Sequence, residues 1–202
     1  MLVSVEVVAA GEAQDPLEMF RVYEAPPAAD RVLEEDEIRA SAVVKERQLV
    51  HRDGDWHRSV EVWVYDEKGR FVVQRRSALK DTNPGMLDTS CAGHVTLDDS
   101  IEETAVRELR EELGCRASAS DLVRGFVAPI EAAGDREIVT VFFLRVVDTH
   151  FVIDPAEVAS LSLLPSATVL DDLRAKAPAY VAKPPHYVDA LSDAFHRLIP
   201  AQ

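Results

Sequence analysis

Three glutamates stand close together in one short segment of this 202-residue chain, and they limit what that segment can form. Glu108, Glu111 and Glu112 are spaced i, i+3 and i+4, so on a helix their Cβ atoms lie roughly 5–6 Å apart on one face. Carboxylates at this spacing repel one another unless a positive charge lies among them. A hard divalent cation such as Mg²⁺, which takes oxygen ligands, would supply that charge.

The residues around the glutamates predict a capped amphipathic helix. Ser100 and Glu103 fit a capping box at its start. Ala105, Leu109 and Leu113 repeat at helical spacing and predict a stripe that packs on a sheet. Glu-rich helices with Glu/Arg spacing are often only solvated surfaces, and the heptapeptide from 107 to 113 alone would favour that interpretation. A resemblance to a metal-binding family motif, which extends from Gly93 to Gly114, favours a metal site instead.

The spacing of the fixed residues resembles the Nudix box, Gly-x5-Glu-x7-Arg-Glu-U-x-Glu-Glu-x-Gly-U, where U is a bulky aliphatic residue. The matching residues are Gly93, Arg107, Glu108, Leu109, Glu111, Glu112 and Gly114. Two positions depart from the pattern, since Asp99 replaces the first Glu and Cys115 fills the last aliphatic position. In the family the first Glu commonly buttresses the motif Arg. We therefore expect an Asp99–Arg107 pair that is weaker or longer but still present.

The resemblance implies an α/β fold, a Nudix-type α/β/α sandwich with a mixed sheet and the motif helix packed on it. Apolar patterns predict strands at 19–23, 60–65, 71–74, 122–128 and 138–147, and helices at 167–177 and from 187 to about 199. We expect a single domain over residues 1–202. It would comprise an N-terminal extension (1–50), a core (about 51–147) and a C-terminal helical part (about 150–202).

The stretch from His51 to Val95 is similar to the Nudix branch that includes isopentenyl diphosphate isomerase and its hydrolase-like relatives. Arg76 and Lys80 fall where members of that branch hold a diphosphate. A guanidinium fork and an ammonium there would neutralise phosphate oxygens that a metal does not reach. The alternative for Arg76 is a solvated strand end.

The isomerase itself needs a cysteine acid/base immediately before its Gly-His pair, and this chain has Ala92 there. Cys91 is one residue too early, and on an extended segment it points to the opposite face. The isomerase also has metal-site residues, which His57, His94, Glu137 and, approximately, His51 match. Taken singly, each histidine is more typical of a structural or surface position than of a ligand. The missing thiol favours a hydrolase over an isomerase.

The resemblance implies a Mg²⁺- or Mn²⁺-dependent pyrophosphohydrolase that acts on acid anhydrides. It would cleave a phosphoanhydride bond in a nucleoside di- or triphosphate, or in a nucleoside diphosphate linked to another moiety. The expected metal ligands are Glu108, Glu111, Glu112 and the carbonyl of Gly93, with Arg107 orienting the carboxylates. The general base is one of Glu111, Glu137 and Glu131. The alternatives are an isoprenoid diphosphate isomerase and a catalytically weak Nudix ligand-binding module.

Composition limits the partners. A net charge of -14 argues against general affinity for a nucleic acid backbone, but it leaves room for a small phosphorylated substrate held by a metal and local cations. Two cysteines make no disulfide framework, and no run of about 18 apolar residues predicts a membrane span. We therefore expect a cytoplasmic protein. Nudix proteins commonly dimerise, so a homodimer is compatible with the resemblance.

Overall fold

The computed structural model describes residues 3–8, 15, 17–132 and 134–199. The strands are β1 (Ser4–Val7), β2 (Met19–Tyr23), β3 (Ala40–Glu46), β4 (His57–Tyr65), β5 (Arg70–Arg76), β6 (Leu87–Asp88), β7 (Cys91–His94), β8 (Val123–Ala132), β9 (Asp135–Arg145), β10 (His150–Ile153) and β11 (Val158–Pro165). The helices are α1 (Arg47–Asp53), α2 (Ile101–Leu113), α3 (Ser166–Arg174) and α4 (Pro185–Leu198), with short 3-10 turns η1 (Glu35–Glu37) and η2 (Ala119–Asp121).

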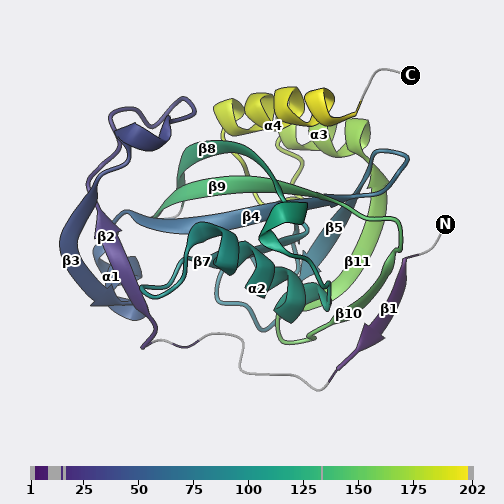
Figure 1. The fold of residues 1–202 in the computed structure, drawn as a ribbon, viewed down its shortest axis with the longest axis horizontal. Coiled ribbons are helices and arrows are strands. Elements are labelled where there is room, and N and C mark those ends of the chain that lie inside the picture. Colours follow the sequence, from purple (N-terminus) through teal and green to yellow (C-terminus); the bar gives the residue numbers. More distant parts are fainter. Residues whose placement is uncertain (1–2, 9–14, 16, 133, 200–202) are drawn as a thin grey trace.

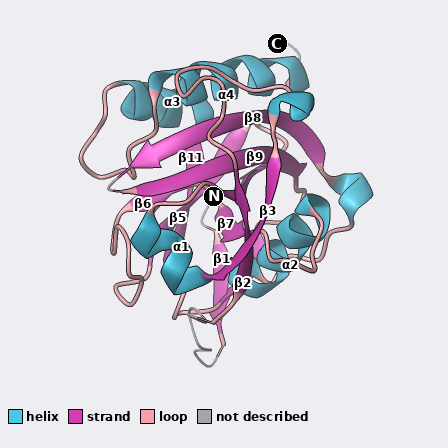
Figure 2. Ribbon diagram, turned by 90° about the vertical axis from the view of Figure 1, so that its left-hand side faces the viewer, coloured by secondary structure: helices cyan, strands magenta, loops and turns pink. Residues whose placement is uncertain are grey.

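A mixed sheet forms the centre of the fold. Its strand order is β11-β5-β4-β9-β8, with β6 paired to β5 and β7 paired to β4. β4 and β9 run parallel, whereas their other pairings in this sheet are antiparallel. α2 packs on one face, and α3 and α4 lie together on the other (Figures 1 and 2). The α/β/α sandwich expected from the resemblance is confirmed.

The motif helix begins and ends where its sequence predicts. The Glu103 amide donates to Ser100 Oγ at 3.2 Å, and the Ser100 amide donates to Glu103 Oε2 at 2.9 Å, which completes the capping box. The helix stops at Gly114, whose φ of 61° is left-handed and suits glycine. Its fully buried stripe is Ala105, Leu109 and Leu113, which packs on Val60, Val62 and Cys91 of the sheet. The helix is thereby held with its glutamate face along the sheet.

The predicted central strands are present and longer than expected. All nine residues of β4 are buried, because helices cover both faces of the sheet. β8 continues to Ala132 and β9 begins at Asp135, so the two strands form a tighter hairpin than the predicted ranges implied. The turn between β4 and β5 contains Gly69 at a φ of 70°.

The N-terminal extension folds against the core. The strand predicted at 19–23 is β2, and it pairs with β3, which the sequence patterns did not reveal. α1 follows directly and was also missed. Residues 34–37 are all acidic, and Glu35 among them lies in the exposed turn η1, where its carboxylate binds Arg58 and Arg124. This acidic segment is a surface turn.

The C-terminal part contributes both helices and strands. The two predicted helices are α3 and α4, each within a few residues of its expected bounds. Two strands were missed: β10, which pairs with β1, and β11, which forms an edge of the main sheet. Among the described helices, none has the length and apolar character needed to cross a bilayer.

Candidate active site

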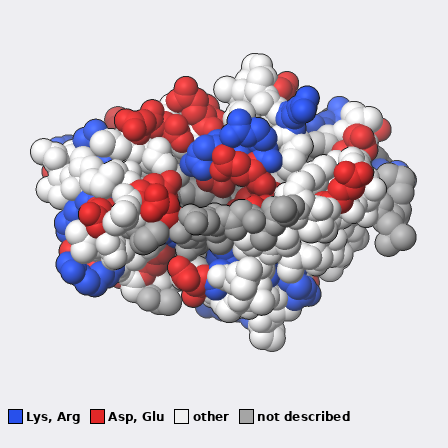
Figure 3. Space-filling view, turned by 90° about the horizontal axis from the view of Figure 1, so that it is seen from below, with Lys and Arg blue, Asp and Glu red and all other residues white. Residues whose placement is uncertain are grey.

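Eight of the predicted site residues line one cleft of about 1440 Å³. They are Gly93, Arg107, Glu108, Glu111 and Glu112 of the box, Arg76 at the end of β5, Lys80 in the loop after β5, and Glu137 of β9. On the face seen from below in Figure 1, acidic and basic side chains lie side by side (Figure 3). Among its described residues this face shows no continuous basic area of the kind that binds a nucleic acid backbone.

The three α2 carboxylates differ in their exposure to the cleft. The side chain of Glu111 is 47% exposed, whereas Glu108 and Glu112 are buried. Gln74 Nε2 donates to Glu112 Oε2 at 3.1 Å. Burial raises the pKa of Glu108 to about 7, and it raises the pKa of Glu112 well above its usual value. Buried carboxylates in this state favour a bound cation that compensates their lost hydration.

Gly93 lies against Glu108 so closely that no side chain fits there. A Cβ at this position would fall well inside van der Waals contact with the Glu108 carboxylate. The glycine therefore lets α2 bring its carboxylate up to the backbone of β7. Peptide oxygen and carboxylate oxygen are the donors that Mg²⁺ and Mn²⁺ accept, so this group of residues fits such an ion.

Arg107 connects the carboxylates of the box. Its Nε donates to Asp99 Oδ2 at 3.1 Å, so the pair expected despite the shorter side chain is present. Its Nη1 lies 2.8 Å from Glu108 Oε1 and 3.2 Å from Glu111 Oε2. This arrangement agrees with the predicted orienting role of Arg107.

The two predicted phosphate-binding cations lie at the wall of the cleft and have internal partners. Arg76 donates to the carbonyl of Thr82 at 3.0 and 3.1 Å and lies 3.3 Å from Asp88 Oδ2. Lys80 forms an ion pair with Glu157. Both side chains are about nine-tenths buried, so Arg76 is not the solvated strand end of the alternative interpretation.

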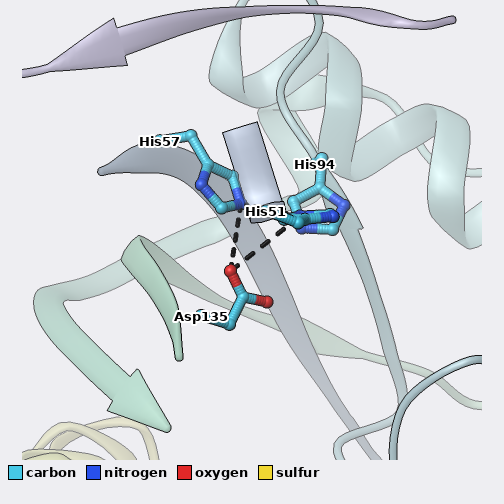
Figure 4. A group of neighbouring side chains, drawn as sticks. All are labelled: His51, His57, His94 and Asp135. Carbon is cyan, nitrogen blue, oxygen red and sulfur yellow. Dashed lines mark hydrogen bonds and ion pairs between the residues drawn. The ribbon is translucent and has the colours of Figure 1, made fainter. Parts of the chain in front are cut away.

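A second group of ligand atoms lies beside the first. Nitrogens of His51, His57 and His94 and an oxygen of Asp135 all lie within 4.8 Å of one another (Figure 4). His57 Nδ1 donates to the carbonyl of Asp55 at 3.0 Å, which leaves Nε2 free to face His51 Nε2 at 3.3 Å. Such a hydrogen bond on the far nitrogen is typical of metal-binding imidazoles.

His51 and His94 are held in the neutral form that binds metals. Burial lowers the pKa of His51 to about 4 and that of His94 to about 3. Nε2 of His94 is buried without a hydrogen-bond partner among the described residues, and Glu137 Oε1 lies 3.6 Å from it. The histidines and Asp135 therefore fit a transition-metal ion better than Mg²⁺.

The N-terminal extension covers this second group. The buried Phe20 ring of β2 stacks on His57 at 5.5 Å and on His94 at 5.0 Å between centroids. Arg47, at the start of α1, has its Nη1 2.8 Å from His94 Nδ1. Residues outside the box thus complete the cleft.

Sequence reasoning missed several residues that line the cleft, including Glu61, Asp88, Asp135 and Lys183. Two of them carry a signal. Glu61 is the one charged residue in the run from 60 to 65 of β4, and Asp135 precedes Glu137 by two residues, which places both on one face of β9. Lys183 stands in a Pro-rich turn and shows no pattern of its own.

The Nudix domain family matches residues 55–183. The chain belongs to the Nudix family. A Nudix hydrolase of Clostridium acetobutylicum is 44% identical over 82 residues, which are 39% of each protein. An isopentenyl-diphosphate Delta-isomerase of Nocardia farcinica is 36% identical over 133 residues, which cover 64% of this chain and 76% of the isomerase. The Nudix resemblance seen in the sequence is thus confirmed, in a branch that includes isomerases.

A solved structure of a Deinococcus radiodurans protein superposes with a TM-score of 0.57. The match covers 88% of this Nudix chain and 99% of the other protein at 20% identity, and it shows the shared fold alone. The chain spans less than half the length of the Clostridium relative.

The two ligand groups should respond differently to metal type. We expect the His57→Asn variant to lose most of the tight Zn²⁺ binding of the native chain and to keep its Mg²⁺ binding, because imidazoles are poor ligands for Mg²⁺. Isothermal titration calorimetry with each ion measures this. His150→Asn, an exposed histidine outside the cleft, is the control. Equal Zn²⁺ binding by His57→Asn and the native chain would show that the histidine group is not a metal site.

The same titrations should show that Mg²⁺ binding and Zn²⁺ binding depend differently on pH. Glu108, with a pKa of about 7, and Glu112, whose pKa burial also raises, must lose their protons to bind Mg²⁺, so the affinity should rise at least roughly tenfold per unit as pH approaches 7 from below. His51 and His94 are already neutral at pH 6, so their protons should not weaken Zn²⁺ binding between pH 6 and 8. A Mg²⁺ affinity that is flat from pH 5.5 to 7 would contradict this assignment.

Proposed function

We propose that this chain is a Mg²⁺- or Mn²⁺-dependent hydrolase of phosphoanhydride bonds. Its substrate would be a nucleoside di- or triphosphate, or a nucleoside diphosphate linked to another moiety. One observation carries the proposal: Glu108, Glu111, Glu112 and Gly93 gather at one cleft with two buried cations, Arg76 and Lys80, in its wall. The Nudix hydrolase name of the Clostridium relative supports it.

In this proposal each group has a separate task. The carboxylates of Glu108 and Glu112 and the Gly93 carbonyl would hold the ion, which when bound neutralises phosphate charge and acidifies water. Arg76 and Lys80 donate to phosphate oxygens, and Lys80 exchanges its Glu157 partner for them. Arg107 fixes Glu108 and Glu111 in position. Substrate binding thus relies on two cations that already have carboxylate partners in the cleft wall.

Glu111 is the general base that we propose. Glu131 does not line the cleft and pairs with Arg136 at 2.9 Å. Glu137 lines it, but contact with His94 lowers the pKa of Glu137 well below its usual value in spite of burial, which makes it a weak proton acceptor near pH 7. Glu111 is exposed at the cleft within reach of a water molecule.

The second candidate function is isomerisation of an isoprenoid diphosphate. The Nocardia relative named as an isomerase favours it, as does the histidine group. Against it, Ala92 stands where the thiol is required. The thiol of Cys91 is fully buried among the α2-facing residues, on the opposite face of β7. Neither Cys91 nor Cys115 lines the cleft.

The native chain should release phosphate or pyrophosphate from members of a nucleotide panel only when Mg²⁺ or Mn²⁺ is present. The panel contains nucleoside di- and triphosphates, nucleoside diphosphate sugars and isopentenyl diphosphate, each with the metal or with EDTA. Turnover that survives EDTA would contradict the metal role. Isomerisation of isopentenyl diphosphate without hydrolysis of the nucleotides would replace this proposal with the second candidate, and binding without turnover would indicate a ligand-binding module.

A further inference from the structure

A buried ion network forms one end of the cleft beyond the residues used so far. Lys183 Nζ lies 2.6 Å from Glu61 Oε1 and 3.1 Å from Asp88 Oδ1. The hydroxyl of Tyr187 donates to the other oxygen of Glu61 and accepts from Trp63 Nε1 at 2.9 Å. The side chains of the three charged residues are only 5–7% exposed, and all three line the cleft. We refer to Glu61, Asp88 and Lys183 as the floor of the cleft at this end.

The network is attached to the proposed phosphate site. Asp88 receives Lys183 through Oδ1 and Arg76 through Oδ2, so one carboxylate separates the two cations. Lys183 is brought there by the segment before α4, in which the Val181 amide donates to the carbonyl of Leu87 at 2.8 Å. A group attached to a phosphate at Arg76 would therefore meet Lys183 and Glu61 next.

The floor is open to a ligand because its neighbour is small. In the pairing of β4 with β7, Glu61 lies directly opposite Ala92, so both side chains point to the same face of the sheet. The methyl group of Ala92 leaves space above the carboxylate where a larger side chain would cover it. Ala92, which argues against an isomerase, thus also leaves Glu61 accessible to a ligand.

The floor is charged and has unused hydrogen-bonding capacity. Asp88 and Glu61 raise the pKa of Lys183 in spite of the opposing effect of burial, so the ammonium remains charged. Two of its three N–H donors are directed at carboxylates. Each oxygen of Glu61 accepts one hydrogen bond and can accept a second. A hydrocarbon tail placed here would bury these groups without new partners, which is unfavourable.

We propose that Glu61 and Lys183 form a subsite for a sugar attached to the diphosphate. One sugar hydroxyl donates to the Glu61 carboxylate and accepts from the Lys183 ammonium. Asp88 connects this subsite to the phosphate-binding cation Arg76. The subsite selects substrates that carry a sugar hydroxyl and rejects prenyl diphosphates. This inference rests on the proposed function, because it assumes that a diphosphate binds beside Arg76.

The variants must keep the buried charges balanced. Lys183→Met alone leaves the buried Glu61 carboxylate without its cation, and such a protein can fail to fold. The double variant Glu61→Gln/Lys183→Met removes one charge of each sign and keeps the Asp88–Arg76 pair. Lys183→Arg keeps the cation. Lys68→Met, an exposed lysine in the β4–β5 turn, is the matched control.

The test compares ADP with 2′,3′-dideoxy-ADP, which lacks only the vicinal hydroxyls, and with isopentenyl diphosphate. Calorimetry in Mg²⁺ on a Glu111→Gln background, which lacks the proposed base, measures the affinities. We expect ADP to bind at least about tenfold more tightly than either other ligand. The ratio should fall to about one in the double variant, persist in Lys68→Met, and be partly retained in Lys183→Arg.

Three results would overturn the subsite: equal affinity for ADP and dideoxy-ADP before substitution, a preference that survives in the double variant, or no binding of any of the three ligands. Failure of the hydrolase proposal gives a different result. In that case the native chain shows no metal-dependent turnover, while the preference for ADP and its loss in the double variant remain.

Discussion

Glu108→Gln and Glu112→Gln should each lower metal-dependent turnover by roughly 10²–10³-fold or more. Gln has nearly the same volume as Glu, but its amide is neutral and a much weaker ligand for a hard cation. Both glutamates face the cleft from the buried side of α2, so water cannot simply replace the lost ligand oxygen. Steady-state kinetics over a range of Mg²⁺ concentrations measures the change, with kcat falling and the Mg²⁺ requirement rising.

Folding should be almost unaffected by these two substitutions. Burial raises the pKa of both carboxylates, so the ionised groups destabilise the metal-free chain at neutral pH and Gln removes that penalty. The melting temperature without metal should stay level or rise. Glu102→Gln, on the same helix but outside the cleft, is the control and should keep full activity. Retained turnover in both Glu108→Gln and Glu112→Gln would remove the assignment of α2 as the metal-binding helix.

Gly93→Ala should lower kcat by about 10²-fold, because the added methyl group displaces the Glu108 carboxylate from the backbone of β7. A misplacement of about 1 Å in a catalytic group can have an effect of this size. Overpacking at this contact should also reduce the free energy of unfolding by about 1–3 kcal/mol. Kinetics and thermal melting on the same preparation give both numbers.

A double-mutant cycle separates this mechanism from a general loss of structure. If Gly93→Ala acts by moving Glu108, then the pair Gly93→Ala/Glu108→Gln should be about as inactive as Glu108→Gln alone. Losses that simply multiply would show that the glycine acts independently of this carboxylate.

The box was predictable because its information is local. The capping residues, the apolar stripe and the terminal glycine of α2 lie within 15 positions, and each acts on its nearest neighbours. The missed strands depend on distant partners instead. β11 has no strict alternation of apolar residues, and it becomes a strand because β5 offers an edge more than 80 positions earlier.

The residues of the cleft also divide into those that local sequence predicts and those that only distant contacts bring together. Gly93 and the glutamates of α2 could be placed from their spacing, whereas Lys183 reaches Glu61 across 122 positions. Only the pairing of the segment before α4 with Leu87 brings the two together. His51 matched its expected place only approximately, because the β2–β3 hairpin and α1 that position it were not fully visible in the sequence.

The position of Phe20 changes what counts as the minimal working unit of this protein. The family match starts at residue 55, but the aromatic wall over His57 and His94 and the imidazole of His51 come from before it. A chain trimmed to the matched region would keep every residue of the box and expose one end of the cleft to bulk water. The residues before 55 therefore supply part of the enclosure of the site, although they lie outside the signature by which the family is recognised.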